Sequence, residues 1–153
     1  MTDAIQDLYP DEHAHCFGCG HRNTMGIQLK SYLNDAATSA SITPPAHYTG
    51  GIPNHLFGGM VASLLDCHGT ASAAAFYQQH LRQSDKLDAT LERFVTANLN
   101  IDYINPTPIN QQLTLKGTLV SIEGRKVRVS LTLTSGQTLC ARATMLAVKL
   151  MAS

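Results

Sequence analysis

The sequence is poor in charge of either sign. Asp, Glu, Lys and Arg make up 14% of the 153 residues, against roughly 25% in an average soluble domain. The 11 basic side chains are balanced by 11 acidic ones, so the formal net charge is zero. Proteins that bind nucleic acids normally carry a basic excess, which argues against that class of partner. So few charges also suggest that part of the surface is covered by a second copy of the chain.

Cysteine is scarce as well, and its spacing does not resemble a disulfide framework. The first 15 residues lack the basic and apolar stretches of a secretory signal. Residues 36–65 contain no Asp, Glu, Lys or Arg, but their three prolines rule out a membrane-spanning helix. Repeats and linkers are also missing. We therefore expect one soluble, cytoplasmic domain over residues 1–153, without membrane association and loosely ordered up to residue 12.

Apolar residues recur with two different periods along the chain. Apolar and polar residues alternate in six runs. The first two, residues 27–33 and 36–42, predict a hairpin. The other four predict later strands: residues 95–103, 113–122, 126–134 and 138–150. From Gly58 onward the spacing is helical, and one stripe is predicted to be buried: Met60, Val61, Leu64, Leu65, His68, Ala71 and Ala75. The predicted order is two strands, one helix of about 20 residues and ~30 Å, then four strands. This order predicts an α+β fold in which an antiparallel sheet wraps around one long helix.

A glycine pair opens the predicted helix, although glycine costs up to ~1 kcal/mol relative to alanine inside a helix. The bare N–H groups of Gly58 and Gly59 could bind a negatively charged oxygen at the positive end of the helix dipole. The plainer alternative is a turn that needs the backbone freedom of glycine. Taken alone, the pair favours the plainer alternative.

Asp66 shifts that balance toward function, because it is the single acid in residues 58–80. Its neighbours on the same helix face are all small: Gly59, Ala62, Ser63, Gly69, Thr70 and Ala73. Another backbone can approach such a stripe closely, and the Thr70 hydroxyl one turn on could partner the carboxylate. A solvated helix residue is the alternative.

The spacing of Gly58 and Asp66 predicts a dimer. Eight residues correspond to about 12 Å along a helix, so one helix cannot place both groups beside the same carbonyl. Two antiparallel copies of the helix could do so. We therefore expect a two-fold dimer with two sites at its interface.

The segments GGMVASLLDCHGT (58–70) and HCFGCGHRNTMGIQLKSY (15–32), with the order of elements, resemble hotdog-fold acyl-CoA thioesterases of the PaaI-like, phenylacetate-pathway type. The resemblance covers residues 15–150 and implies a homodimer or tetramer that hydrolyses small, medium or aromatic acyl-CoA esters. It makes Gly58 the oxyanion-hole donor, with help from Gly59, and Asp66 the general base or nucleophile. Thr70 matches a hydroxyl that follows the acid in some members. Coenzyme A is then part of the substrate, and no separate cofactor is expected.

One departure from the family's pattern concerns the residue before the glycines, which is histidine in the family and Phe57 here. His55 or Asn54 could supply the missing polar group, and Phe57 would contact the substrate. Basic residues near the last-but-one hairpin are candidate contacts for the coenzyme A phosphates, with a solvated turn as the alternative: Arg125, Lys126 and Arg128.

Cys16 and Cys19 form a C-x-x-C motif with histidines beside it. Zinc needs four ligands; the loop could nearly supply them with His15 or His21, but no second C-x-x-C follows. We therefore expect no metal and interpret the loop as a turn beneath the active site. Cys67 and Cys140 are predicted to be small core residues, and His68 to be a core or interface residue.

Two other functions compete with hydrolysis. A hydratase would need an Asp and a His placed together in a longer loop motif, which this chain lacks. A non-catalytic acyl-CoA-binding or regulatory hotdog protein would keep the pocket and tolerate Phe57. Tight binding of a CoA ester without turnover would identify it.

Overall fold

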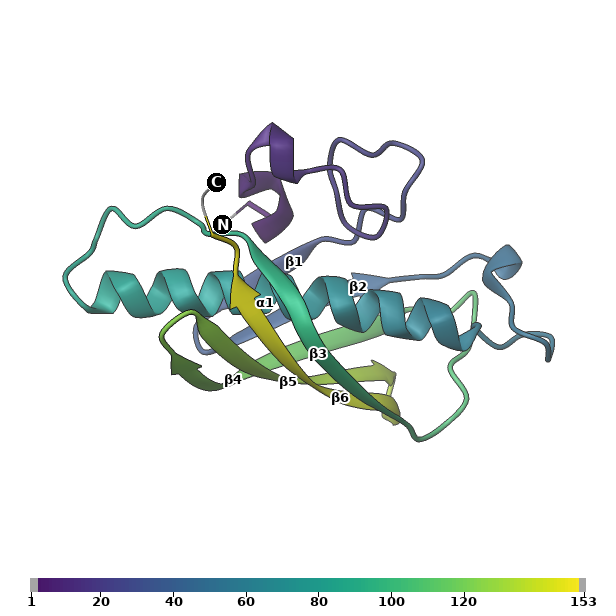
Figure 1. The fold of residues 1–153 in the computed structure, drawn as a ribbon. Helices are drawn as coiled ribbons and strands as arrows, with labels where there is room; N and C mark the ends of the chain where they lie inside the picture. The colour runs from purple at the N-terminus through teal and green to yellow at the C-terminus, as the bar shows by residue number, and fades with distance from the viewer. Residues whose placement is uncertain (1–2, 152–153) are drawn as a thin grey trace.

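The computed structural model describes residues 3–151, which contain one α-helix and a six-stranded antiparallel sheet that curves across it (Figure 1). The helix is α1 (Gly58–Gln83), and the strands are β1 (Ser31–Asn34), β2 (Ala37–Ile42), β3 (Phe94–Tyr103), β4 (Leu113–Glu123), β5 (Lys126–Ser135) and β6 (Thr138–Lys149). Their order in the sheet is β1-β2-β4-β5-β6-β3. The predicted α+β class and the hotdog arrangement are confirmed.

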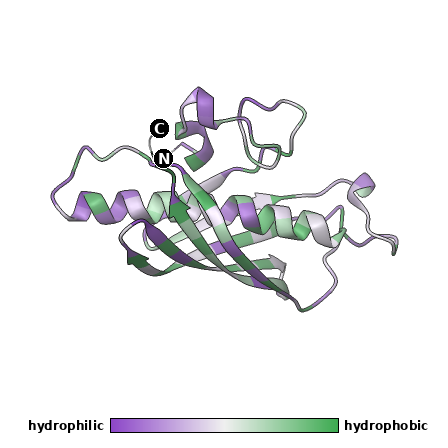
Figure 2. Cartoon of the chain, in the orientation of Figure 1, coloured by the Kyte–Doolittle hydropathy of each residue, from purple (hydrophilic) through white to green (hydrophobic). Residues whose placement is uncertain are grey.

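Alternating side chains produce the long strands. Along β5 every second residue is buried, beginning with Val127 and Val129, and the residues between them stay in contact with solvent. Figure 2 shows the same alternation as interleaved hydrophobic and hydrophilic segments along the strands. The hairpins on either side of β5 turn at Gly124 (φ 60°) and Gly136 (φ 57°), a conformation that glycine adopts without steric cost. Because the buried residues of the strands lie on one side, the sheet has one apolar face that packs against the helix.

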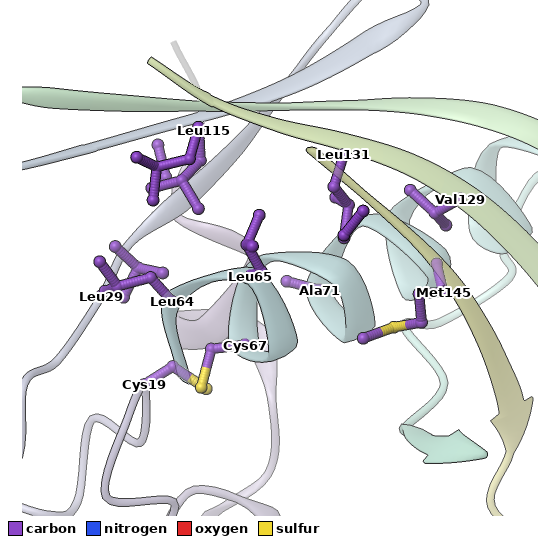
Figure 3. Close-up of a cluster of buried hydrophobic side chains, with 14 of the residues drawn as sticks. Cys19, Leu29, Leu64, Leu65, Cys67, Ala71, Leu115, Val129, Leu131 and Met145 are labelled. Carbon is purple, nitrogen blue, oxygen red and sulfur yellow. The ribbon is translucent and has the colours of Figure 1, made fainter. Parts of the chain in front are cut away.

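The helix buries the stripe that its spacing predicts. All seven predicted positions are less than 6% exposed. Leu65 points toward the part of the sheet that carries Leu115 and Leu131, and Leu64 lies beside Leu29 (Figure 3). α1 is 26 residues long rather than about 20, because no glycine or proline interrupts its last turns.

Two details of the start of the chain differ from the prediction. The first strand begins at Ser31 rather than residue 27, because Gln28 has a φ of 55° that breaks the extended run. The prediction of a loosely ordered start is wrong for residues 3–12. This segment includes the 3-10 turn Ile5–Leu8, and the side chains of Ile5 and Tyr9 are buried. Gln6 fixes this segment because its amide exchanges two hydrogen bonds with Ser31, at 2.8 and 3.0 Å. Residues 1–2 lie outside the described residues.

Candidate active site

The N-terminus of α1 presents free backbone donors. Phe57 precedes the helix with an extended backbone (φ −68°, ψ 145°), and its carbonyl accepts hydrogen bonds from Met60 and Val61. Within residues 3–151, no acceptor bonds the N–H of Gly58 or Gly59, and no side chain caps the helix. These N–H groups stand at the positive end of the helix dipole, where a negatively charged oxygen is stabilised.

Backbone freedom does not explain the glycine pair, and close packing explains Gly59 alone, because a Cβ on Gly58 would only reach ordinary contact with the Tyr103 ring at 3.6 Å. Among the described glycines, only Gly124 and Gly136 have positive φ, so the alternative of a strained turn at residues 58–59 is wrong. A Cβ on Gly59 would lie 2.7 Å from Cε2 of Phe57, whose ring therefore lies against the glycine. The backbone of Gly58 faces Tyr103, whose hydroxyl donates to the Gly58 carbonyl at 2.8 Å.

A surface pocket of about 310 Å³ adjoins the helix start, with Gly58, His55 and Tyr103 in its lining. Among the described residues, the buried Nδ1 of His55 has no hydrogen-bond partner, so it could serve a ligand that enters the pocket. Asn54 is exposed, with a φ of 70°, and its carbonyl accepts from the Ile109 N–H at 3.3 Å. The structure thus brings His55 to the helix start and leaves the Asn54 side chain at the surface.

Asp66 is held by a residue that the sequence analysis did not identify. Its half-buried carboxylate accepts a hydrogen bond at Oδ1 from the hydroxyl of Thr96 on β3. No donor in residues 3–151 bonds Oδ2, so that oxygen remains available to a reactant. Thr96 follows the buried Phe94 by two residues and therefore lies on the helix-facing side of β3. The alternation of polar and apolar residues over 96–102 predicts a strand, but it does not indicate which helix residue Thr96 contacts.

Thr70 does not partner the Asp66 carboxylate as predicted. Its hydroxyl donates to the backbone carbonyls of Asp66 and Cys67, each at 3.3 Å. Threonine in a helix commonly bonds the carbonyl one turn earlier, and this local bond competes with longer-range partners. The hydroxyl that contacts the carboxylate comes from the strand instead.

The predicted phosphate contacts lie at one end of the sheet. Arg125 is exposed in the β4–β5 turn and Lys126 at the first residue of β5, and Arg125 donates to the Lys149 carbonyl at 3.0 Å. The register joins Lys126 through Val148 to Val95, so the turn lies at the end of β3 that carries Thr96. Lys126 and Arg128 are exposed on either side of the buried Val127, so both side chains lie on the sheet face away from Asp66.

His68 is a core residue, as predicted. It is fully buried, with Nδ1 2.8 Å from the Ser31 hydroxyl and Nε2 3.2 Å from the Thr38 hydroxyl. Burial lowers the pKa of this imidazole from 6.5 to about 4. The neutral ring therefore links α1 to β1 and β2 rather than serving the surface site.

Three of the four cysteines come together beside α1. Cys67 is buried, as predicted, but its Sγ lies 3.8 Å from that of Cys16, and Cys19 completes the group. Hydrogen bonds from the thiols of Cys19 and Cys67 hold the pKa of Cys16 well below its usual range. His21 does not join them, because its ring bonds the Gln6 carbonyl at 3.0 Å. Cys140 is buried apart from the group, on β6.

No helix within residues 3–151, the long α1 included, combines the length and apolar character needed to cross a bilayer.

Comparison with known proteins gives consistent matches. Residues 53–142 match the family described as Thioesterase superfamily. An acyl-coenzyme A thioesterase named THEM4 from Rattus norvegicus is 36% identical over 102 residues, which cover 65% of this chain and 38% of the relative. THEM4 from Xenopus laevis is 32% identical over 107 residues, or 69% and 42%. The chain thus spans about two fifths of the length of these curated relatives.

Solved structures agree in fold. A thioesterase superfamily protein from Shewanella loihica PV-4 is 39% identical and superimposes with a TM-score of 0.70, covering 94% of this chain and 100% of that one. The PaaI protein of the phenylacetic acid degradation operon of E. coli is 12% identical, with a TM-score of 0.66 over 82% and 81% of the two chains. At that identity the second match supports the fold alone.

Proposed function

The chain belongs to the thioesterase superfamily, and from this premise we propose that it hydrolyses acyl-CoA thioesters with Gly58 and Asp66. The observation that carries the proposal is the Asp66 carboxylate, which is partly exposed, fixed at one oxygen by Thr96 and free at the other. The name of the THEM4 relatives, acyl-coenzyme A thioesterase, supports the same substrate class. Small, medium and aromatic acyl groups are the proposed range.

The reaction needs a site for the oxyanion and a group that attacks or activates water. The N–H of Gly58, with that of Gly59 beside it, would stabilise the negative charge that develops on the thioester oxygen. Oδ2 of Asp66 would either take a proton from the attacking water or attack the carbonyl carbon itself to give an anhydride, which water then hydrolyses. On both routes the C–S bond breaks, and the products are the free acid and coenzyme A.

We propose that the two groups meet across a dimer interface. They are eight residues apart on one helix, which corresponds to about 12 Å. The edge strand β3 lies beside both of them, since Thr96 bonds Asp66 and Tyr103 bonds Gly58. The apolar side chains of Val95 and Tyr103 are 43% and 56% exposed on this strand. A second chain packed here would cover them and bring its own helix to the site.

The substrate would lie along the same surface. The acyl group would enter the apolar space beside α1, with Phe57 at its entrance and His55 facing the pocket at Gly58. Arg125 stands exposed at the Thr96 end of β3, where it could contact the coenzyme A phosphates. Lys126 and Arg128 would reach a substrate only from the other face of the sheet.

The test is hydrolysis of a panel of short-chain, long-chain and aromatic acyl-CoA esters, followed by release of free thiol. Asp66→Asn should lower kcat by roughly 10²–10⁴, the usual contribution of a general base. Asp35→Asn is the matched control, because Asp35 is exposed in the β1–β2 turn with a φ of 53° that asparagine tolerates.

Three outcomes can be distinguished in this assay. Turnover that Asp66→Asn abolishes and Asp35→Asn preserves supports the proposal. Equal turnover in all three proteins would place the chemistry elsewhere. Binding of an ester without hydrolysis would instead identify a non-catalytic acyl-CoA-binding protein, in which Phe57 has replaced a needed polar group.

A further inference from the structure

Three sulfur atoms from two distant parts of the chain converge on the side of α1 that faces the N-terminal loop. Cys16 and Cys19 come from the loop before β1, and Cys67 comes from the helix; their Sγ atoms all lie within 4.8 Å of one another. Figure 3 shows the sulfurs of Cys19 and Cys67 meeting below Leu64 and Leu65. All three thiols are free. We call this group the thiol cluster.

The loop is folded tightly enough to need glycine at two positions around the cluster. A Cβ on Gly18 would lie 2.3 Å from Sγ of Cys67, so the loop backbone lies directly over that sulfur. A Cβ on Gly20 would lie 2.4 Å from the Ala14 carbonyl. The Gly20 N–H donates to the Cys16 carbonyl at 2.7 Å and closes the turn between the two loop cysteines. The tight loop backbone therefore fixes the positions of the two loop cysteines against Cys67.

We propose that Cys16, Cys19 and Cys67 bind one Zn²⁺ ion through three thiolates. A Zn–S bond of about 2.3 Å and tetrahedral angles place ligand sulfurs about 3.8 Å apart. The Cys16 and Cys67 sulfurs are 3.8 Å apart. All three cysteines bind as thiolates, so binding releases the protons that they still carry. Cys16 is only half-buried, so a water molecule completes the coordination on its side.

The number of sulfurs favours a metal over a disulfide. A disulfide would use two of the three and leave a buried thiol without a role, whereas a thiophilic cation uses all three. The C-x-x-C spacing is the usual one for two zinc ligands from a single turn. The third ligand, Cys67, was counted as a core residue in the sequence analysis, which is why the loop alone fell short of a site. A bound ion would tie this loop to α1 one residue after Asp66.

Zinc content is the direct test. Protein purified under reducing conditions, incubated with Zn²⁺ and freed of excess metal by gel filtration should retain about one ion per chain by elemental mass spectrometry. Cys16→Ala removes a half-buried ligand and should reduce this content at least tenfold, and Cys67→Ala should do the same. Cys140→Ala is the matched control, because this buried cysteine lies apart from the cluster, and it should keep the full content.

A spectroscopic readout keeps the test independent of stability and of catalysis. Co²⁺ bound by three thiolates gives intense thiolate-to-metal charge-transfer absorption, which is expected for the unmodified chain and Cys140→Ala and should be lost in Cys16→Ala. Absence of both retained zinc and this absorption in the folded, reduced protein would overturn the proposal. So would a disulfide within the cluster that forms equally fast with and without Zn²⁺, which would mark the cluster as a redox pair.

Discussion

Asp66 and Thr96 form a pair in which one hydroxyl fixes one carboxylate oxygen and leaves the other free. A carboxylate that must take a proton or attack a carbon needs a fixed direction, because small misplacements of a reacting atom are costly in rate. Thr96 is thus a positioning residue. It would act through Asp66 and not on the substrate itself.

Thr96→Val keeps the shape of the strand residue and removes the hydroxyl. We expect kcat to fall about tenfold with KM nearly unchanged, the size of effect that loss of one hydrogen bond to a charged group produces. Steady-state kinetics on the best CoA ester measure both constants. Thr118→Val, on the exposed face of β4, is the control and should match the unmodified protein. A rise in KM alone would mean that Thr96 contacts substrate instead.

At the residue scale, the residue types that surround a position on its helix indicated a functional role more clearly than the residue type at that position alone. Asp66 stands out because its helix neighbours are small and uncharged, whereas nothing in the sequence marks Thr96 as its partner. The meeting of the two residues depends on how α1 crosses β3, which is a property of the packed sheet. Cys67 is buried as predicted, but its cysteine neighbours were not foreseen for the same reason, since a loop fifty residues earlier in the chain supplies them.

At the scale of elements, a buried polar network joins α1 to the first hairpin. His68 on the helix contacts the hydroxyls of Ser31 on β1 and Thr38 on β2, and Thr38 lies 2.6 Å from the Ser72 hydroxyl. Each of these side chains is fully buried. Burial keeps the imidazole neutral, so one ring nitrogen donates to a hydroxyl of the network and the other accepts from one.

This network predicts a loss of stability in mild acid. The pKa of His68 is about 4 in the folded protein and 6.5 as its ordinary value, because burial disfavours the charged ring. The unfolded chain therefore takes up a proton first, so the contribution of His68 is complete above pH 6.5 and is lost as the pH falls toward 4. The loss in the free energy of unfolding should reach about 3 kcal/mol.

Urea unfolding at a series of pH values measures this loss. His68→Asn should show a smaller decline over the same interval, and His80→Gln, which changes an exposed histidine of the same helix, should decline like the unmodified protein. An equal decline in the unmodified protein and His68→Asn would assign the acid sensitivity to other groups.

The helix and the strands were predictable because the apolar residues of each recur with either helical or alternating spacing. Strands β4, β5 and β6 begin at the predicted residues, since glycine turns separate β4 from β5 and β5 from β6. The hairpin before them was less accurate, because Gln28 adopts a conformation that its alternating neighbours do not indicate. The packing of the N-terminal segment depends on a side-chain bond between Gln6 and Ser31, 25 residues apart, which no local pattern encodes.

At the scale of the whole molecule, the proposed site is complete only in a dimer. Gly58 can be changed to remove its donor without moving the backbone, because proline is well accommodated at the first position of a helix. The extended conformation of Phe57 suits a residue before proline. Gly58→Pro should therefore keep the fold and lower turnover by roughly 10²–10³, as loss of an oxyanion donor does.

Mixed dimers test the central claim most directly. Asp66→Asn and Gly58→Pro chains, each nearly inactive alone, are given different tags and co-expressed, and the dimers that carry both tags are isolated. One of their two sites then combines an intact Gly58 with an intact Asp66, so we expect about half of the unmodified turnover per dimer. Mixed dimers as inactive as either parent would contradict a site shared between two chains.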